Sequence, residues 1–171
     1  LVSGTGMLFK DGTGTLSVAQ AETYTGATSI NAGTLALTGD GSIATSSGVT
    51  LSGGTFDISG TTDGASIASL SGNSGGAVAL GGETLTLTDA AGSFAGTIAG
   101  TGGVTLLDGH ETLTGNNSYT GGTTITGGTL TGTTGSFGTG EIVDNGTLEL
   151  RQSADGALTN TVSGTGALVI Y

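Results

Sequence analysis

The sequence predicts an all-β fold, a right-handed parallel β-helix of about eight windings, with residues 1–171 forming one β-solenoid segment. One observation is internal repetition, because the string from Tyr119 to Leu130 (YTGGTTITGGTL) echoes the string from Tyr24 to Leu35 (YTGATSINAGTL). A second is that apolar residues following glycine-containing turns recur at intervals close to one winding, which indicates stacked repeats. The apolar residues that define these intervals are Leu16, Leu35, Phe56, Leu85, Leu106, Leu130, Leu148 and Leu168.

Composition agrees with a stacked core and disfavours other uses of glycine. Of 171 residues, 37 are glycine, none is proline and 4% are aromatic. This composition does not suit an ordinary globular core. The glycines follow no Gly-X-Y period, and the apolar residues occur in alternating runs instead of being absent. Collagen and disorder are therefore disfavoured.

The charge balance excludes several kinds of partner. Lys10 and Arg151 stand against 13 acidic residues, which gives a formal net charge of -11. Phosphate binding needs a basic patch, so the sequence predicts no nucleic-acid partner and no electrostatic docking on anionic membranes. No apolar run approaches the roughly 20 residues that span a bilayer, so membrane insertion of this segment is not expected. The chain has no cysteine, which excludes a disulfide and a thiolate metal site.

Short segments of alternating apolar and polar residues are predicted strands with one buried and one wet face. Asp57 and Glu149 each lie between two apolar residues. An unpartnered carboxylate in the core would be very costly, so both acids are expected on the outer face. The neighbours that must then face inward are Phe56, Ile58, Leu148 and Leu150.

Glycine pairs are predicted corners between these strands, where tight turns require positive φ angles. The pairs concerned are Gly53–Gly54, Gly75–Gly76, Gly81–Gly82, Gly102–Gly103 and Gly127–Gly128. Threonine, a good strand former, would form ladders up an outer wall if it recurred once per winding. The longest interval, from Phe56 to Leu85, is interpreted as one winding with a protruding loop. No segment has a sustained helical period, so the fold is expected to be nearly all β.

The segment from Asn117 to Leu130 resembles the passenger-associated transport repeat of autotransporter passenger domains in Gram-negative bacteria. The resemblance covers the pattern Asn-x-Tyr-Thr-Gly-x-Thr-x-Ile-x-x-Gly-x-Leu. The earlier copy places Glu22 where asparagine is expected, and residues 93–98 resemble a decayed third copy.

This resemblance implies a right-handed β-helix that is exported across the outer membrane through a C-terminal β-barrel translocator outside this segment. It implies an extracellular location at the bacterial cell surface. Passengers of the family act as adhesins, self-association factors, proteases, esterases or toxins, and the repeat itself is associated with export and folding. Residues 168–171 stop within a predicted strand, so the segment is expected to be part of a longer array.

A serine-hydrolase site is the first enzyme class to consider, because the chain has one histidine, His110. Residues 72–76 match Gly-x-Ser-x-Gly around Ser74, and Asp89 and His110 follow in hydrolase order. That motif requires a strand-to-helix turn, and no helix is expected here. Although Asp108 and Glu111 flank the histidine, the sequence is interpreted as a solvated glycine turn. We therefore predict no catalytic residue and no enzymatic activity.

Other candidate sites are equally weak. The acidic residues are spread almost evenly along the chain, whereas glycoside hydrolases need converging carboxylates, so carbohydrate cleavage is not expected. No metal or other cofactor is predicted. Tyr24 and Tyr119 could form a sugar-stacking pair, but repetition favours corner residues packed on the rod. Thr-x-Thr triplets begin at Thr84, Thr124 and Thr129, and such triplets can form an ice-binding surface, which orders water, if they share one register in successive windings. These triplets are expected not to share a register.

The function predicted from these observations is that of an extracellular stalk in an autotransporter adhesin, which mediates surface attachment or self-association. Its expected partners are glycans, host surface proteins or identical passengers. The alternative is a scaffold for secretion and folding without binding activity of its own. A carbohydrate-active β-helix enzyme is the third possibility.

Overall fold

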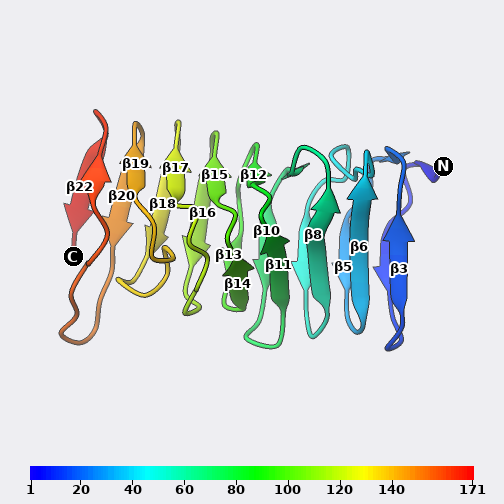
Figure 1. The fold of residues 1–171 in the computed structure, drawn as a ribbon, viewed down its shortest axis with the longest axis horizontal. Coiled ribbons are helices and arrows are strands. Elements are labelled where there is room, and N and C mark those ends of the chain that lie inside the picture. Colours follow the sequence, from blue (N-terminus) through cyan, green and yellow to red (C-terminus); the bar gives the residue numbers. More distant parts are fainter.

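The computed structural model describes residues 1–171 as a rod of stacked β-strands, with the N-terminus at one end and the C-terminus at the other (Figure 1). It contains 22 strands and no helix, and hence no helix long and apolar enough to cross a membrane. All strand pairings are parallel, and three long sheets form the walls of the rod. The predicted parallel β-solenoid is confirmed.

The nine-stranded sheet runs the length of the rod. Its strands, in spatial order, are β2 (Leu8–Lys10), β5 (Thr28–Ile30), β7 (Val49–Leu51), β10 (Leu70–Gly72), β13 (Ser93–Phe94), β16 (His110–Leu113), β18 (Thr129–Gly132), β20 (Thr147–Leu150) and β22 (Ala167–Ile170). Successive strands belong to successive windings, since Leu130 pairs with Leu148 and Leu148 pairs with Leu168. Nine strands in this order agree with about eight windings.

Two shorter sheets complete the walls. The five-stranded sheet consists of β3 (Thr15–Val18), β6 (Thr34–Gly39), β8 (Thr55–Thr61), β11 (Ala77–Gly81) and β14 (Thr97–Gly100). The six-stranded sheet consists of β9 (Ala65–Ile67), β12 (Leu85–Leu87), β15 (Val104–Leu106), β17 (Thr123–Ile125), β19 (Ile142–Asp144) and β21 (Val162–Ser163). A small two-stranded sheet pairs β1 (Ser3–Gly4) with β4 (Thr23–Tyr24). The five-stranded sheet ends at β14, and beyond it irregular segments close each winding.

The apolar residues used to predict the windings do not form one column. Leu35 pairs with Phe56 in the five-stranded sheet, and the next residue of that column is Val78. Leu85 belongs to the six-stranded sheet, so the interval from Phe56 to Leu85 crosses several walls. The predicted protruding loop is therefore wrong, because this interval contains β9, β10 and β11. All three walls share the same alternating pattern, which does not by itself identify the wall.

The core is a continuous cluster of 30 buried residues. Phe56, Ile58 and Leu148 are fully buried and Leu150 is almost so, which confirms the four predicted inward positions. Asp57 and Glu149 lie between these pairs and face outward, as predicted. The exposed large apolar residues, apart from Leu107, lie in the first and last windings.

Glycine serves two different purposes at the corners. Gly128 has φ 73° and Gly33, at the matching place in the earlier string, has φ 66°, so both turns need a residue that tolerates positive φ. Gly102 does not have positive φ, yet a Cβ there would overlap the backbone carbonyl of Glu83 in the previous winding. The prediction that positive φ explains every glycine pair is therefore wrong. Close approach between windings explains Gly102.

Candidate functional site

The two repeated strings build the same buried cluster. Tyr24 and Tyr119 are 1% and 0% exposed, so neither ring is accessible to a sugar. The hydroxyl of Tyr24 lies 2.6 Å from Oγ1 of Thr28, and that of Tyr119 lies 2.7 Å from Oγ1 of Thr123. The interpretation of both tyrosines as residues packed into the rod is confirmed, and the sugar-stacking pair is wrong.

Each tyrosine–threonine pair is connected to the next winding. Oγ1 of Thr28 lies 2.9 Å from Oγ of Ser46, and Oγ1 of Thr123 donates to the carbonyl of Phe137 at 3.1 Å. Burial raises the pKa of both tyrosines above the ordinary value, with hydrogen bonds opposing the shift in part. Both phenols therefore remain neutral near pH 7 and act as structural hydrogen-bonding groups.

Asn117 connects three windings. Its Oδ1 accepts a hydrogen bond from the backbone N–H of Ile98 at 2.8 Å, and its Nδ2 donates to the carbonyl of Ser136 at 2.7 Å. The side chain is buried, so these bonds satisfy backbone groups that have no strand partner beyond the end of the five-stranded sheet. Glu22, which replaces this asparagine in the earlier string, accepts a hydrogen bond from Val2 N–H. A carboxylate can accept a hydrogen bond as the asparagine amide does, but it cannot donate one.

The family model described as passenger-associated-transport-repeat matches residues 8–37 and residues 99–131. The chain carries passenger-associated transport repeats. Such repeats in a parallel β-solenoid match an autotransporter passenger domain, and the repeat family implies export to the cell surface and association with a translocator domain. No curated protein and no solved structure matches the chain.

The two matched repeats occupy different parts of the rod. The first runs from β2 to β6, and the second begins at the end of β14 and ends within β18. Residues 93–98, proposed as a decayed third copy, lie outside both matches. In each repeat, tyrosine and threonine are buried while the intervening residues form the corner. The repeat thus encodes an internal hydrogen-bonded corner.

The histidine of the chain lies on the outer face of the nine-stranded sheet. Nε2 of His110 is 2.9 Å from Oγ1 of Thr131, which donates to Oε2 of Glu149 at 3.1 Å. Arg151 also donates to Oε2 of Glu149, at 3.1 Å. A hydrolase triad needs histidine between the nucleophile and the acid, whereas here threonine lies between histidine and the acid.

The residues considered for a serine-hydrolase site are not brought together. Ser74 lies in an exposed corner after β10, and Asp89 lies in an exposed corner after β12. His110 begins β16, so its interpretation as a turn residue is wrong. Its ring hydrogen-bonds to Thr131, not to Ser74 or Asp89.

Glu111 differs most from expectation. The sequence around it predicts a solvated turn, yet Glu111 is 0% exposed and lies inside β16. Neither carboxylate oxygen has a hydrogen-bond partner of good geometry, although the backbone of Leu70 and Gly92 is near enough to favour the ionised form slightly. Burial dominates and raises the pKa of Glu111 to about 8. The signal that was missed is the strand alternation, which places Glu111 on the same face as Leu113.

Two other charged residues are also buried. Lys10 is 6% exposed, and its Nζ donates to the carbonyls of Asp11, Gly12 and Ala32 at 3.0, 2.8 and 3.1 Å. Asp144 is 2% exposed, and its Oδ1 accepts from Gly146 N–H at 3.0 Å. Unlike Glu111, both have hydrogen-bond partners for the charged group.

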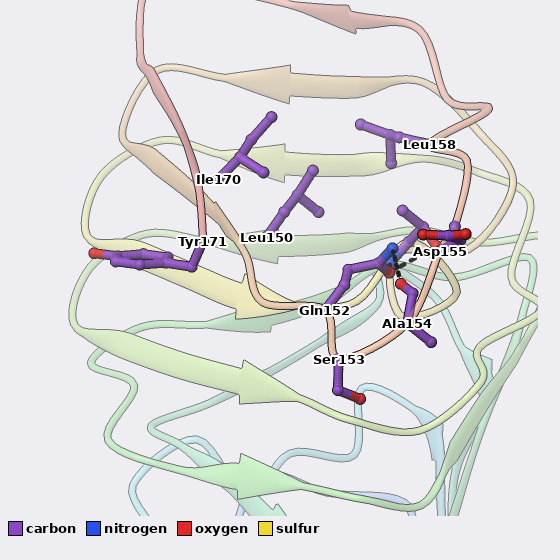
Figure 2. A pocket seen from close by; sticks show the side chains of 10 residues that line it. Leu150, Gln152, Ser153, Ala154, Asp155, Leu158, Ile170 and Tyr171 are labelled. Carbon is purple, nitrogen blue, oxygen red and sulfur yellow. Dashed lines mark hydrogen bonds between the residues drawn. The ribbon is translucent and has the colours of Figure 1, made fainter.

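The larger of two surface hollows, of about 520 Å³, lies beside the loop that follows β20 (Figure 2). Leu150, Leu158 and Ile170 supply its apolar part. Gln152 is held at its edge, because Oε1 accepts hydrogen bonds from N–H and Oγ1 of Thr134 at 2.8 and 2.9 Å. Asp155 is the one carboxylate in its lining, whereas glycoside hydrolysis uses a pair.

Aligned hydroxyl groups occupy the outer walls, as the threonine-ladder prediction anticipated. On the six-stranded sheet the register aligns Ser66, Thr86, Thr105 and Thr124. On the nine-stranded sheet a second row contains Ser29, Thr50, Ser71, Ser93, Thr112 and Thr131. The Thr-x-Thr triplets do not share a register, as expected, because Thr86, the last residue of one triplet, is level with Thr124, the first residue of another. Thr131 lies on a different sheet from these two.

Proposed function

We propose that this passenger segment is an adhesive stalk that contacts glycans, host surface proteins or an identical rod through its hydroxyl-lined walls. The observation that supports the proposal is the pair of aligned hydroxyl rows on the six-stranded and nine-stranded sheets. Apart from Thr131, which is buried and bonded to His110 and Glu149, these groups lie on the outer face of the rod. The hydroxyls of Tyr24 and Tyr119, at matching places in the two strings, are used inside the rod. A wall hydroxyl that makes no hydrogen bond within the rod is available to an outside partner.

Weak contacts become useful when they are repeated on a rigid support. One hydrogen bond contributes only about 0.5–1.5 kcal/mol net. A row with one hydroxyl in each winding, spaced by about 4.8 Å, offers many such bonds at once. Rods displayed in many copies on a cell would add avidity to this weak affinity. Attachment through the walls needs no deep cleft.

Valine substitutions test the wall proposal, because valine keeps the β-branched shape and removes the hydroxyl. We expect cells displaying a passenger with Thr86, Thr105 and Thr124 all changed to valine, together with Thr50→Val and Thr112→Val, to lose about tenfold or more in surface attachment and aggregation. The matched control carries five valine substitutions at exposed threonines that lie in corners outside the strands: Thr13, Thr62, Thr84, Thr120 and Thr139. Equal attachment by the wall variant and the control, at equal surface display, would contradict the proposal.

A second candidate function, a scaffold for secretion and folding, is favoured by the buried Asn117 and Tyr119 cluster of the matched repeat. Removal of residues 1–171 from the exported protein separates the two functions. If the segment is an adhesive stalk, export is retained and attachment is lost. If it is a scaffold, export falls while activity located elsewhere in the passenger is retained per exported molecule.

A further inference from the structure

Glu111 places an acid in the middle of the rod with no charged partner, and only the nearby backbone of Leu70 and Gly92 slightly favours its ionised form. Its inward column continues to Leu130 and Leu148 on β18 and β20, which are fully buried. On the other side it lies level with Gly92, because the N–H of Thr112 donates to the carbonyl of Gly92 at 3.1 Å. Both carboxylate oxygens lack partners of good geometry. Glu111 thus occupies a position that leucine fills in the next two windings.

No charged side chain is available to neutralise it. The strands packed beside β16, which are β13 and β18, contain no titratable residue, and neither do β10 and β15. On β16 itself, His110 faces outward and hydrogen-bonds to Thr131. Asp89 and Asp108, in the corners that lead to this sheet, are exposed. Tyr119 belongs to the same winding, and its buried phenol is neutral and bonded to Thr123.

We propose that the protonation state of Glu111 controls how often the central windings of the rod open, and that the protonated carboxyl keeps them closed. With the carboxyl protonated, the winding around β16 closes as the rest of the core does. Ionisation places a charge without a charged partner among apolar side chains, which is costly unless water enters. The windings from β13 to β18 then open more often, while those near the ends of the rod are unaffected.

The direction of the pH effect follows from proton binding. Burial holds the pKa of Glu111 at about 8 in the folded rod, above the 4.5 of an ordinary glutamate. Between these two values the folded state binds more protons than the unfolded state, so the free energy of unfolding falls as pH rises. The stabilisation is complete below about pH 4.5 and is lost as the pH passes through about 8.

Urea unfolding of the 171-residue chain tests this role of Glu111. We expect the wild-type urea midpoint to fall between about pH 5 and about pH 9, and the Glu111→Gln variant to lose most of this dependence. Glu111→Leu, which continues the leucine column, should behave like Glu111→Gln and keeps the test valid if the buried amide destabilises the fold. Glu83→Gln is the matched control, because it removes the same charge from a corner and should leave the wild-type pH dependence intact.

Carboxyl carbon NMR gives a second, local measurement. The Glu111 signal should titrate several pH units above those of exposed glutamates, and amide exchange in β13, β16 and β18, corrected for its intrinsic pH dependence, should rise as it does so. The proposal is overturned if Glu111 titrates as an ordinary glutamate. It is also overturned if Glu111→Gln and Glu83→Gln retain equal pH dependence of the urea midpoint.

Discussion

Asn117→Ala is expected to lower the free energy of unfolding by roughly 2–6 kcal/mol, because it leaves two buried backbone groups without partners at about 1–3 kcal/mol each. Those groups are the N–H of Ile98 and the carbonyl of Ser136, which belong to the windings on either side. Alanine has no side-chain donor or acceptor, and the site is too buried for bulk water to replace both bonds. Urea unfolding followed by circular dichroism measures the loss.

Asn116 supplies the matched control for this variant. It is the neighbouring asparagine in the same segment, but it is exposed, so water can replace any hydrogen bond that its side chain makes. Asn116→Ala should therefore change the free energy of unfolding by less than about 0.5 kcal/mol. Asn117→Asp adds a further test, since aspartate is similar in shape, accepts from Ile98 and fails to donate to Ser136 when ionised. Equal losses for Asn116→Ala and Asn117→Ala would show that the buried connection is unimportant.

Gly102→Ala should also destabilise the rod strongly, by about 1–3 kcal/mol or more, as overpacking of a rigid interior does. A Cβ at this position would overlap the carbonyl of Glu83 in the preceding winding. The overlapping atom is backbone and not the end of a flexible side chain, so the windings themselves must separate. Gly102 also donates to the carbonyl of Gly81 at 2.9 Å, which ties it to the ladder that would be displaced.

Gly82→Ala is the control for Gly102→Ala. The nearest atom to a Cβ at Gly82 is Oγ1 of Thr101, at an ordinary 3.7 Å, and its φ is not positive. Alanine there should be neutral or should stabilise by about 0.4–1 kcal/mol, because it restricts the unfolded chain. The measurement is again the urea midpoint at constant pH. If both alanine variants were equally stable, close packing between windings would not explain Gly102.

The passenger repeat illustrates how far a local pattern determines structure. The matching strings around Tyr24 and Tyr119 predicted stacked windings because repetition at this period requires each unit to pack on its neighbours. Alternation in residues 55–58 and 147–150 predicted which side chains face inward, since neighbouring residues in a strand point to opposite faces. Both conclusions need only the order of residues along one strand or one repeat.

Assignment to a wall needed the structure. Phe56 and Leu85 have the same local pattern but lie on different sheets, because the number of residues used at each corner decides where the next strand begins. The same limit applies to the hydroxyl rows. Thr86 and Thr124 align only because β15 (Val104–Leu106) places Thr105 between them.

The sequence by itself determined the repeat, the stacked all-β architecture and the inward positions of residues such as Phe56 and Leu148, because these follow from periodicity and alternation. Only the tertiary structure decided that Glu111 is buried without a partner, and that Asn117 joins windings before and after its own. A side chain's solvation and hydrogen bonds depend on atoms about 20 residues away in sequence, which the coiling of the chain brings within reach.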